Sequence, residues 1–154
     1  MIDDARFEDG RETPLNLGAT DVDDLEVISA LVQDAVLPVT EMTYVARERR
    51  FAMLLNRFRW ENGAQSAERV QSVLSVEGVM KVSSQGVDRS DTDMILSVLS
   101  LGFEAGKDGG GTVEIILAGD GALRLSVEAI EARLKDVTKP YTAPSRRAPS
   151  HPQE

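Results

Sequence analysis

The fold of this chain follows from one segment, Phe51-Ala52-Met53-Leu54-Leu55-Asn56-Arg57-Phe58-Arg59-Trp60. Its apolar side chains alternate as those of a β-strand do, because successive residues of a strand point to opposite faces. One face carries Ala52, Leu54, Phe58 and Trp60. The other face begins with Phe51, Met53 and Leu55 and continues with Arg57 and Arg59. The first half of the segment is therefore predicted to be buried on both faces, and the second half on one.

An amphipathic helix is predicted before this strand. Thr20 or Asp21 can cap its first turn, and Asp23 and Asp24 place negative charge where the helix dipole favours it. Apolar residues then recur at steps of three and four and gather on one stripe: Val22, Leu25, Ile28, Leu31, Val32, Ala35 and Val36. Pro38 ends the helical pattern.

Further strands are predicted after the deciding segment. They cover residues 70–76, 79–87, 94–103 and 113–118. The stretch 106–111, rich in glycine and aspartate, joins the last two as a hairpin loop. Near the end of the domain, residues 123–127 alternate as in a strand, whereas Val127, Ile130, Leu134 and Val137 step as in a helix. A short strand is therefore predicted to run into a closing helix.

The order of these elements predicts an α+β domain. We expect a strongly bent antiparallel sheet or a partly open barrel, with one helix at its N-terminal end and one at its C-terminal end. A pleckstrin-homology-like barrel is one topology that fits this count of elements. Residues 1–19 are expected to be a mobile leader, and residues 138–154, which hold four of the six prolines, a disordered tail. Residues 20–137 remain as a single domain.

Composition excludes several kinds of site. The chain has no cysteine, which rules out disulfides and thiolate chemistry. Its one histidine, His151, lies in the predicted tail, so the domain is not expected to hold a Ser/His/Asp triad or a histidine-bound metal. No catalytic residue, metal ligand or cofactor is predicted. The net charge of −9 opposes binding to nucleic acid or to anionic membranes, and no apolar run is long enough to span a bilayer. A cytoplasmic location is expected.

Three acidic or glycine-rich motifs have simple structural explanations. Segment 102–108 resembles a phosphate-binding loop, but only three residues separate its glycines and Asp108 stands where Ser or Thr is needed. Asp88, Asp91 and Asp93 lack the glycine and distal glutamate of a calcium loop, so we expect them to be solvated. Glu128, Glu131, Lys135 and Asp136 are predicted to form the wet face of the closing helix, with Glu131 and Lys135 placed for an ion pair.

The basic segment 47–69 is the most informative feature for function. It carries six arginines against three glutamates, a local charge of +3 in a chain of net charge −9. Arginines beside aromatic residues are enriched at protein interfaces and at sites for anions. Arg50, Arg57, Arg59 and Trp60 are therefore candidate partner-binding residues for an unknown protein or a small anionic ligand. The alternative is that Arg57 and Arg59 lie on the solvent face of the strand and neutralise neighbouring acids.

Asn56 is unusual because alternation places it between Leu54 and Phe58 on an apolar face. A buried amide without partners costs roughly 1–3 kcal/mol, so we expect Asn56 to bond to backbone, water or another side chain. A ligand-orienting role is the alternative.

Several runs of this sequence resemble a small bacterial family of unknown function. They are residues 24–36 (DLEVISALVQDAV), 50–61 (RFAMLLNRFRWE), 121–125 (GALRL) and 128–132 (EAIEA). The family is the domain-of-unknown-function family twenty-nine forty-eight, and the likeness covers most of residues 20–137. The resemblance implies one compact domain in a bacterial cytoplasm and brings no catalytic residues.

The sequence favours a non-enzymatic soluble binding or interaction domain. A homo-oligomer is the first alternative, because both faces of residues 94–103 are apolar and need cover. An enzyme that uses carboxylates or lysine is the second, and would need a pocket that holds Asn56 or several acids with shifted pKa values.

Overall fold

Strands make up more than half of the described residues. The computed structural model describes residues 13–62 and 68–142. The strands are β1 (Asn16–Ala19), β2 (Val36–Pro38), β3 (Met42–Val45), β4 (Arg50–Phe58), β5 (Glu68–Val76), β6 (Val79–Gln85), β7 (Ile95–Ala105), β8 (Gly111–Leu117), β9 (Gly121–Val127), β10 (Ala132–Asp136) and β11 (Tyr141–Thr142). The helical elements are α2 (Val22–Val32) and three 3₁₀ turns, η1 (Val39–Glu41), η2 (Ala46–Glu48) and η3 (Trp60–Asn62).

All strand pairs are antiparallel and belong to one sheet. Its order is β1-β10-β5-β4-β2-β7-β8-β9-β6, with β11 beside β5 and β3 beside β4. Within the described residues there are eleven strands and a single α-helix. The predicted α+β domain with a helix at each end, whether drawn as a bent sheet or as a pleckstrin-homology-like barrel, is therefore wrong. The molecule is a large open antiparallel sheet with one helix.

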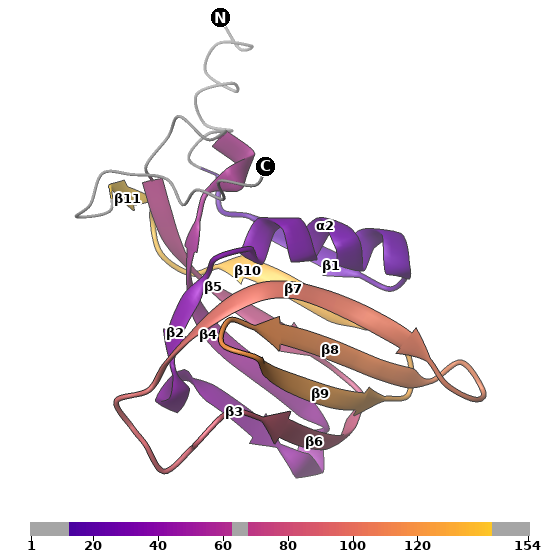
Figure 1. The fold of residues 1–154 in the computed structure, drawn as a ribbon. Coiled ribbons are helices and arrows are strands. Elements are labelled where there is room, and N and C mark those ends of the chain that lie inside the picture. The colour runs from indigo at the N-terminus through magenta and orange to yellow at the C-terminus, as the bar shows by residue number, and fades with distance from the viewer. Residues whose placement is uncertain (1–12, 63–67, 143–154) are drawn as a thin grey trace, which may run out of the picture.

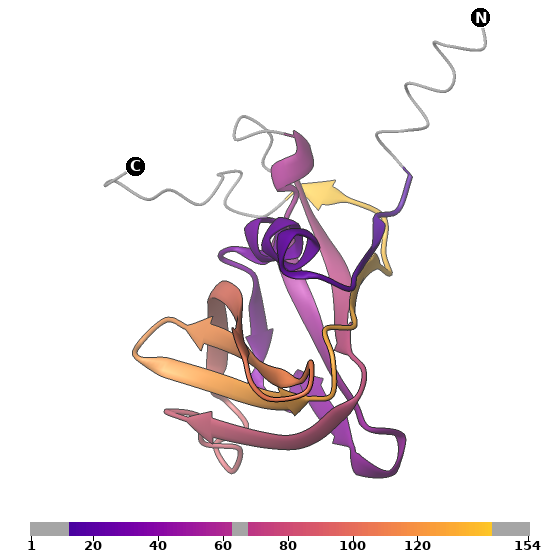
Figure 2. The same ribbon diagram turned by 90° about the vertical axis from the view of Figure 1, so that its right-hand side faces the viewer.

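The two halves of the sheet face each other across one apolar core. Figures 1 and 2 show β7, β8, β9 and β6 on one side and β10, β5, β4 and β3 on the other. The short β2 joins the halves, because it pairs with both β4 and β7. Inward residues of the two sides, such as Met53 and Leu55 on β4 and Ile115 on β8, are at most 1% exposed. In β4 the core face carries Phe51, Met53, Leu55 and Arg57. The other face is only partly buried at Ala52 and Leu54, so the prediction that the first half of this strand is buried on both faces is wrong.

Helix α2 begins where the sequence predicts and covers one open end of the core (Figures 1 and 2). Asp21 caps it, since the Asp24 amide donates to the Asp21 carboxylate over 2.8 Å. Leu25, Ile28 and Val32 form its buried stripe. The helix ends earlier than Val36, because the backbone at Asp34 takes a positive φ of 64° and turns the chain into β2.

The predicted closing helix is absent, and β10 takes its place. Ala132 and Leu134 point into the core while Arg133 and Lys135 point out, which is the alternation of a strand. β10 pairs with β5 over its whole length, so its backbone hydrogen bonds are made across the sheet. The expected Glu131–Lys135 ion pair and the wet helical face are therefore wrong. Side chains four residues apart in a strand are about 13 Å apart, and Asp136 is only 6% exposed.

The sheet extends beyond residues 20–137 on both sides. β1 lies inside the segment predicted to be a leader, and it pairs with β10. β11 lies beyond residue 137 and pairs with Arg69 and Glu68 of β5. Residues 1–12 of the predicted leader and 143–154 of the predicted tail, which include His151, fall outside the described residues.

The contact of α2 with the core can be tested with two neighbouring residues of the helix. Ile28 is 0% exposed and Val27 is 51% exposed. Ile28→Ala is expected to lower the free energy of unfolding by about 2–5 kcal/mol, because it leaves a cavity. Val27→Ala should change it by about 0.5 kcal/mol or less. Urea unfolding followed by circular dichroism measures both, and equal losses would contradict this packing.

Candidate functional site

Arg57 is the centre of a buried network of charges. Its side chain is charged and yet 0% exposed, because it projects from the same face of β4 as the core residues Met53 and Leu55. Its guanidinium donates to both carboxylate oxygens of Glu61, over 2.9 and 2.8 Å. It also donates to the Asp136 carboxylate and to the Ser72 hydroxyl, each over 2.8 Å. Arg57 is thus neither on the solvent face nor accessible to a partner in this conformation.

The network joins Arg57 of β4 to four other parts of the chain. Asp136, at the end of β10, accepts from the Ser72 hydroxyl of β5 over 2.6 Å and from the backbone amide of Leu15, just before β1, over 2.9 Å. Glu61 comes from η3, the turn that follows β4. Each charge therefore has a partner of opposite sign, which is the condition under which buried charges are tolerated.

For both Arg57 and Glu61, the ion pairs and hydrogen bonds outweigh the effect of burial on the pKa. Burial alone would lower the pKa of Arg57, but its hydrogen bonds to Glu61 and Asp136 raise it above its usual value. Burial would raise the pKa of Glu61, but hydrogen bonds from Arg57 and from the backbone hold it below its usual value. Both groups therefore stay ionised at neutral pH.

The other predicted residues at this end of β4 also make internal contacts. The Arg59 side chain is 5% exposed and donates to Glu68 over 2.8 Å. The Trp60 indole donates to the Gln33 carbonyl at the end of α2 over 2.9 Å, and its ring meets Phe58 edge to face at 4.6 Å. The solvent-face interpretation of Arg57 and Arg59 is wrong, and their assignment to partner binding, like that of Trp60, stays a prediction.

Asn56 and Arg50 lie on the outer face of the same strand. The Asn56 amide nitrogen contacts the Tyr141 hydroxyl at 2.6 Å, while its buried oxygen has no hydrogen-bond partner among the described residues. A ligand-orienting role for Asn56 stays a prediction. Arg50 is half-exposed and donates to Glu77 over 2.7 Å, which raises its pKa.

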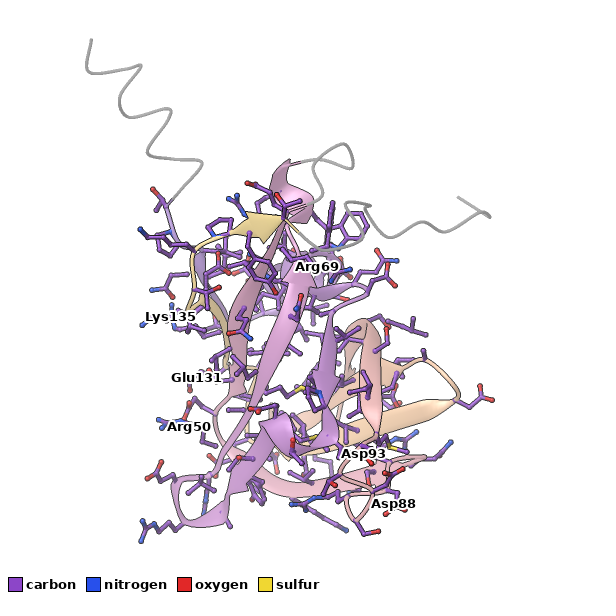
Figure 3. The ribbon with its side chains drawn as sticks, turned by 90° about the vertical axis from the view of Figure 1, so that its left-hand side faces the viewer. Arg50, Arg69, Asp88, Asp93, Glu131 and Lys135 are labelled. Carbon is purple, nitrogen blue, oxygen red and sulfur yellow. The ribbon has the colours of Figure 1, made fainter. Side chains whose placement is uncertain are left out.

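Arg50 borders a polar cavity of about 400 Å³ on the outer face of the sheet. Arg133 on β10 and Glu131, just before it, also line the cavity. Figure 3 shows Arg50, Glu131 and Lys135 along this side of the molecule. Arg50 bonds to Glu77 and Arg133 to Asn16. Glu77 and Glu131 balance the two arginines in the lining, so the cavity has no excess of positive charge to attract an anion.

A second, mainly apolar groove lies between β3 and β6. Each of these strands is paired on one side only, β3 with β4 and β6 with β9. At one end the two strands are tied together: the Tyr44 hydroxyl donates to the Val79 carbonyl over 2.8 Å, and the Val79 amide donates to the Arg49 carbonyl over 2.8 Å. Beyond this tie no backbone hydrogen bond joins β3 to β6 within residues 13–62 and 68–142.

We call this feature the β3–β6 groove, and its volume is about 180 Å³. It is lined by Met42, Thr43, Tyr44, Phe51, Val82, Ser83, Ser84, Arg89 and Leu123. Met42 and Tyr44 stand opposite buried residues of β4, and Val82 and Ser84 stand opposite buried residues of β9. The groove is therefore a place where the apolar core reaches the surface between two strands.

Sequence reasoning missed both the groove and the acids of the network. Alternation of Met42 and Tyr44 indicates that β3 has an inward face, but nothing local brings β3 next to β6. Of the two acids that pair with Arg57, Glu61 lies four residues away in the basic segment, whereas Asp136 was hidden. Asp136 is 79 residues away, and its own segment resembles a helix.

The described residues contain neither a metal-ligand cluster nor a membrane-spanning helix. They hold no group of three or more His, Cys, Asp or Glu side chains arranged for a metal ion. No helix in residues 13–62 or 68–142 has the length and apolar character needed to cross a membrane.

The buried network can be tested against an exposed ion pair on the same strand. Arg57→Ala leaves the carboxylates of Asp136 and Glu61 without their main partner, and should lower the free energy of unfolding by about 3–5 kcal/mol. Arg50→Ala removes a half-exposed pair and should cost about 1 kcal/mol or less. Chemical denaturation measures both, and an Arg57→Ala protein as stable as Arg50→Ala would contradict a structural role for the network.

The lowered pKa of Glu61 predicts an acid-dependent loss of stability. Because its pKa is lower in the folded state than the usual 4.5, its contribution is present above that value and is lost as the pH falls through the folded pKa. The stability difference between the native protein and Glu61→Gln should be constant above about pH 5 and shrink below it. Unfolding curves between about pH 3 and pH 6 measure this. A difference that stays constant over this range would show that the pKa of Glu61 is the same in the folded and the unfolded protein.

The comparisons with known proteins place the chain in a family. No curated protein and no solved structure matches it. The family model described as "Protein of unknown function (DUF2948)" matches residues 15–151, which include β1, β11 and every strand between them. The chain belongs to the DUF2948 family of proteins of unknown function.

Proposed function

We propose that this protein is a non-enzymatic interaction domain that binds an extended segment of a partner protein in the β3–β6 groove. The observation that carries the proposal is the pair of free strand edges on either side of a mainly apolar pocket. In strand addition, an incoming segment takes its affinity from backbone hydrogen bonds and its specificity from side-chain pockets.

The backbone supports this mode of binding. The free edges of β3 and β6 each leave a row of amides and carbonyls without a strand partner, and such an edge is a template for another strand. The tie at Tyr44 and Val79 closes one end of the groove. A bound segment would therefore enter from the other end, where Met42, Ser84 and Arg89 lie.

The side chains support it as well. Phe51 and Leu123 are at most 3% exposed and make the floor of the groove, while Met42 and Val82 are partly buried walls. The volume of about 180 Å³ is below the roughly 300 Å³ at which small-molecule sites begin. The groove thus suits one apolar side chain of a longer chain better than a free ligand.

Filling the groove is the direct test of this function. Ser84 stands opposite the buried Leu123 and shares its inward direction, so Ser84→Leu places an apolar side chain in the groove. A random dodecapeptide library displayed on phage is selected on the native protein and on the variant. The native protein should enrich a set of peptides, and Ser84→Leu should reduce their recovery by about tenfold or more, which corresponds to about 1.4 kcal/mol.

Ser126→Leu is the matched control. Ser126 lies on the neighbouring β9, between inward-facing Leu125 and Val127, and therefore points to the outer face. This variant should recover the same peptides within about twofold, and both variants should unfold within about 1 kcal/mol of the native protein. No enriched peptides, or equal loss in both variants, would overturn the proposal. A dimer in sedimentation that Ser84→Leu dissociates would assign the groove to a second copy of the chain instead.

A further inference from the structure

The open end of the β3–β6 groove is acidic. Arg89, which lines the groove, lies in a loop that also carries Asp88, Asp91 and Asp93. Two successive turns keep this loop compact, because the Asp91 amide donates to the Asp88 carbonyl and the Met94 amide donates to the Asp91 carbonyl. Figure 3 shows Asp88 and Asp93 together at one end of the molecule, away from Arg50 and Glu131.

A fourth acid reaches the same end from η1. Glu41 is exposed and directly precedes Met42, a wall of the groove. The Val39 amide of η1 donates to the Met94 carbonyl over 2.9 Å, which holds η1 beside the end of the acidic loop. Glu41 and the three loop aspartates therefore lie in the two segments that border the entrance, together with Arg89.

The Asp88 carboxylate stays charged at neutral pH. The Ser90 hydroxyl donates to Asp88 over 2.5 Å and the Ser90 amide donates to it over 3.0 Å, and these bonds lower the pKa of Asp88. Asp93 makes no side-chain hydrogen bond or ion pair with the described residues, so its charge is free to act on a ligand.

Four of the six arginines of the basic segment are already paired with acids. Arg57 and Arg59 are buried against Glu61, Asp136 and Glu68. Arg49 and Arg50 pair with Glu128 and Glu77 at the closed end of the groove. The chain as a whole carries a net charge of −9. The net charge of the chain and the acidic residues at the entrance therefore both favour a positively charged ligand.

We infer that the segment bound in the β3–β6 groove is a cationic peptide: one large apolar side chain occupies the groove, and one or more lysines or arginines follow it at the entrance beside Asp88 and Asp93. This inference rests on the proposed function, since it specifies the partner of the same groove. Backbone pairing accepts any sequence, so the apolar pocket and the acidic entrance are what select one segment over another.

The test uses the full-length protein and the same phage-displayed dodecapeptide library. Peptides recovered in a Ser84-dependent manner should combine a large apolar residue with lysine or arginine two to five positions away. Asp93→Lys reverses a charge at the entrance and should lower the recovery of these peptides by about three- to tenfold, as expected for one or two exposed charge pairs. The effect should diminish as salt is raised.

Glu104→Lys is the matched control. Glu104 is an exposed residue of β7, which is separated from β6 by β8 and β9, and its replacement changes the net charge by the same amount. It should alter recovery by less than about twofold. Equal effects of the two variants, or recovered peptides that are neutral or acidic, would overturn the cationic assignment while the groove remains a peptide site. A library with no Ser84-dependent peptides would instead overturn the proposed function itself.

Discussion

The buried ion pair between Arg57 and Asp136 is the contact on which much of this fold depends. Arg57 ends the inward face of β4, and Asp136 ends that of β10, so their pairing across β5 holds one end of the sheet together. Two buried charges are stable only while both are present and hydrogen-bonded. Glu61, Ser72 and the Leu15 amide supply the remaining bonds, which ties η3, β5 and the entry to β1 to the same point.

This network changes the meaning of the basic segment. Its excess of arginines suggests an exposed surface for a partner, yet the structure uses Arg57 and Arg59 to close the core. The acids that neutralise them are Glu61 and Glu68 of the basic segment itself and Asp136 at the end of β10. The molecule as a whole is acidic, and its two ends differ. The end near η3 is sealed by charge pairs and by Trp60, whereas the other end opens between β3 and β6.

Several elements could be predicted from the sequence because their signals are local. The Asp21 cap and the apolar stripe of α2 lie within a few turns of one helix. The alternation of β4 also places Arg57 on the same face as Met53 and Leu55, as found. Its burial could not be predicted, because a strand end becomes core only when partners such as Asp136 reach it. The prediction of a closing helix was wrong for a similar reason. The apolar pattern of this segment fits both a helix and a strand, and the segment becomes a strand because the edge of β5 is there to pair with it.

By itself, the sequence determined the order of most strands along the chain, the position of α2, the hairpin between β7 and β8, and membership of an uncharacterised family. These follow from periodicity, capping and turn chemistry, which act over a few residues. Only the tertiary structure decided which strands lie side by side, that two arginines are buried, and that β3 and β6 approach without pairing. Such features depend on contacts between residues far apart in the chain, so no local pattern encodes them.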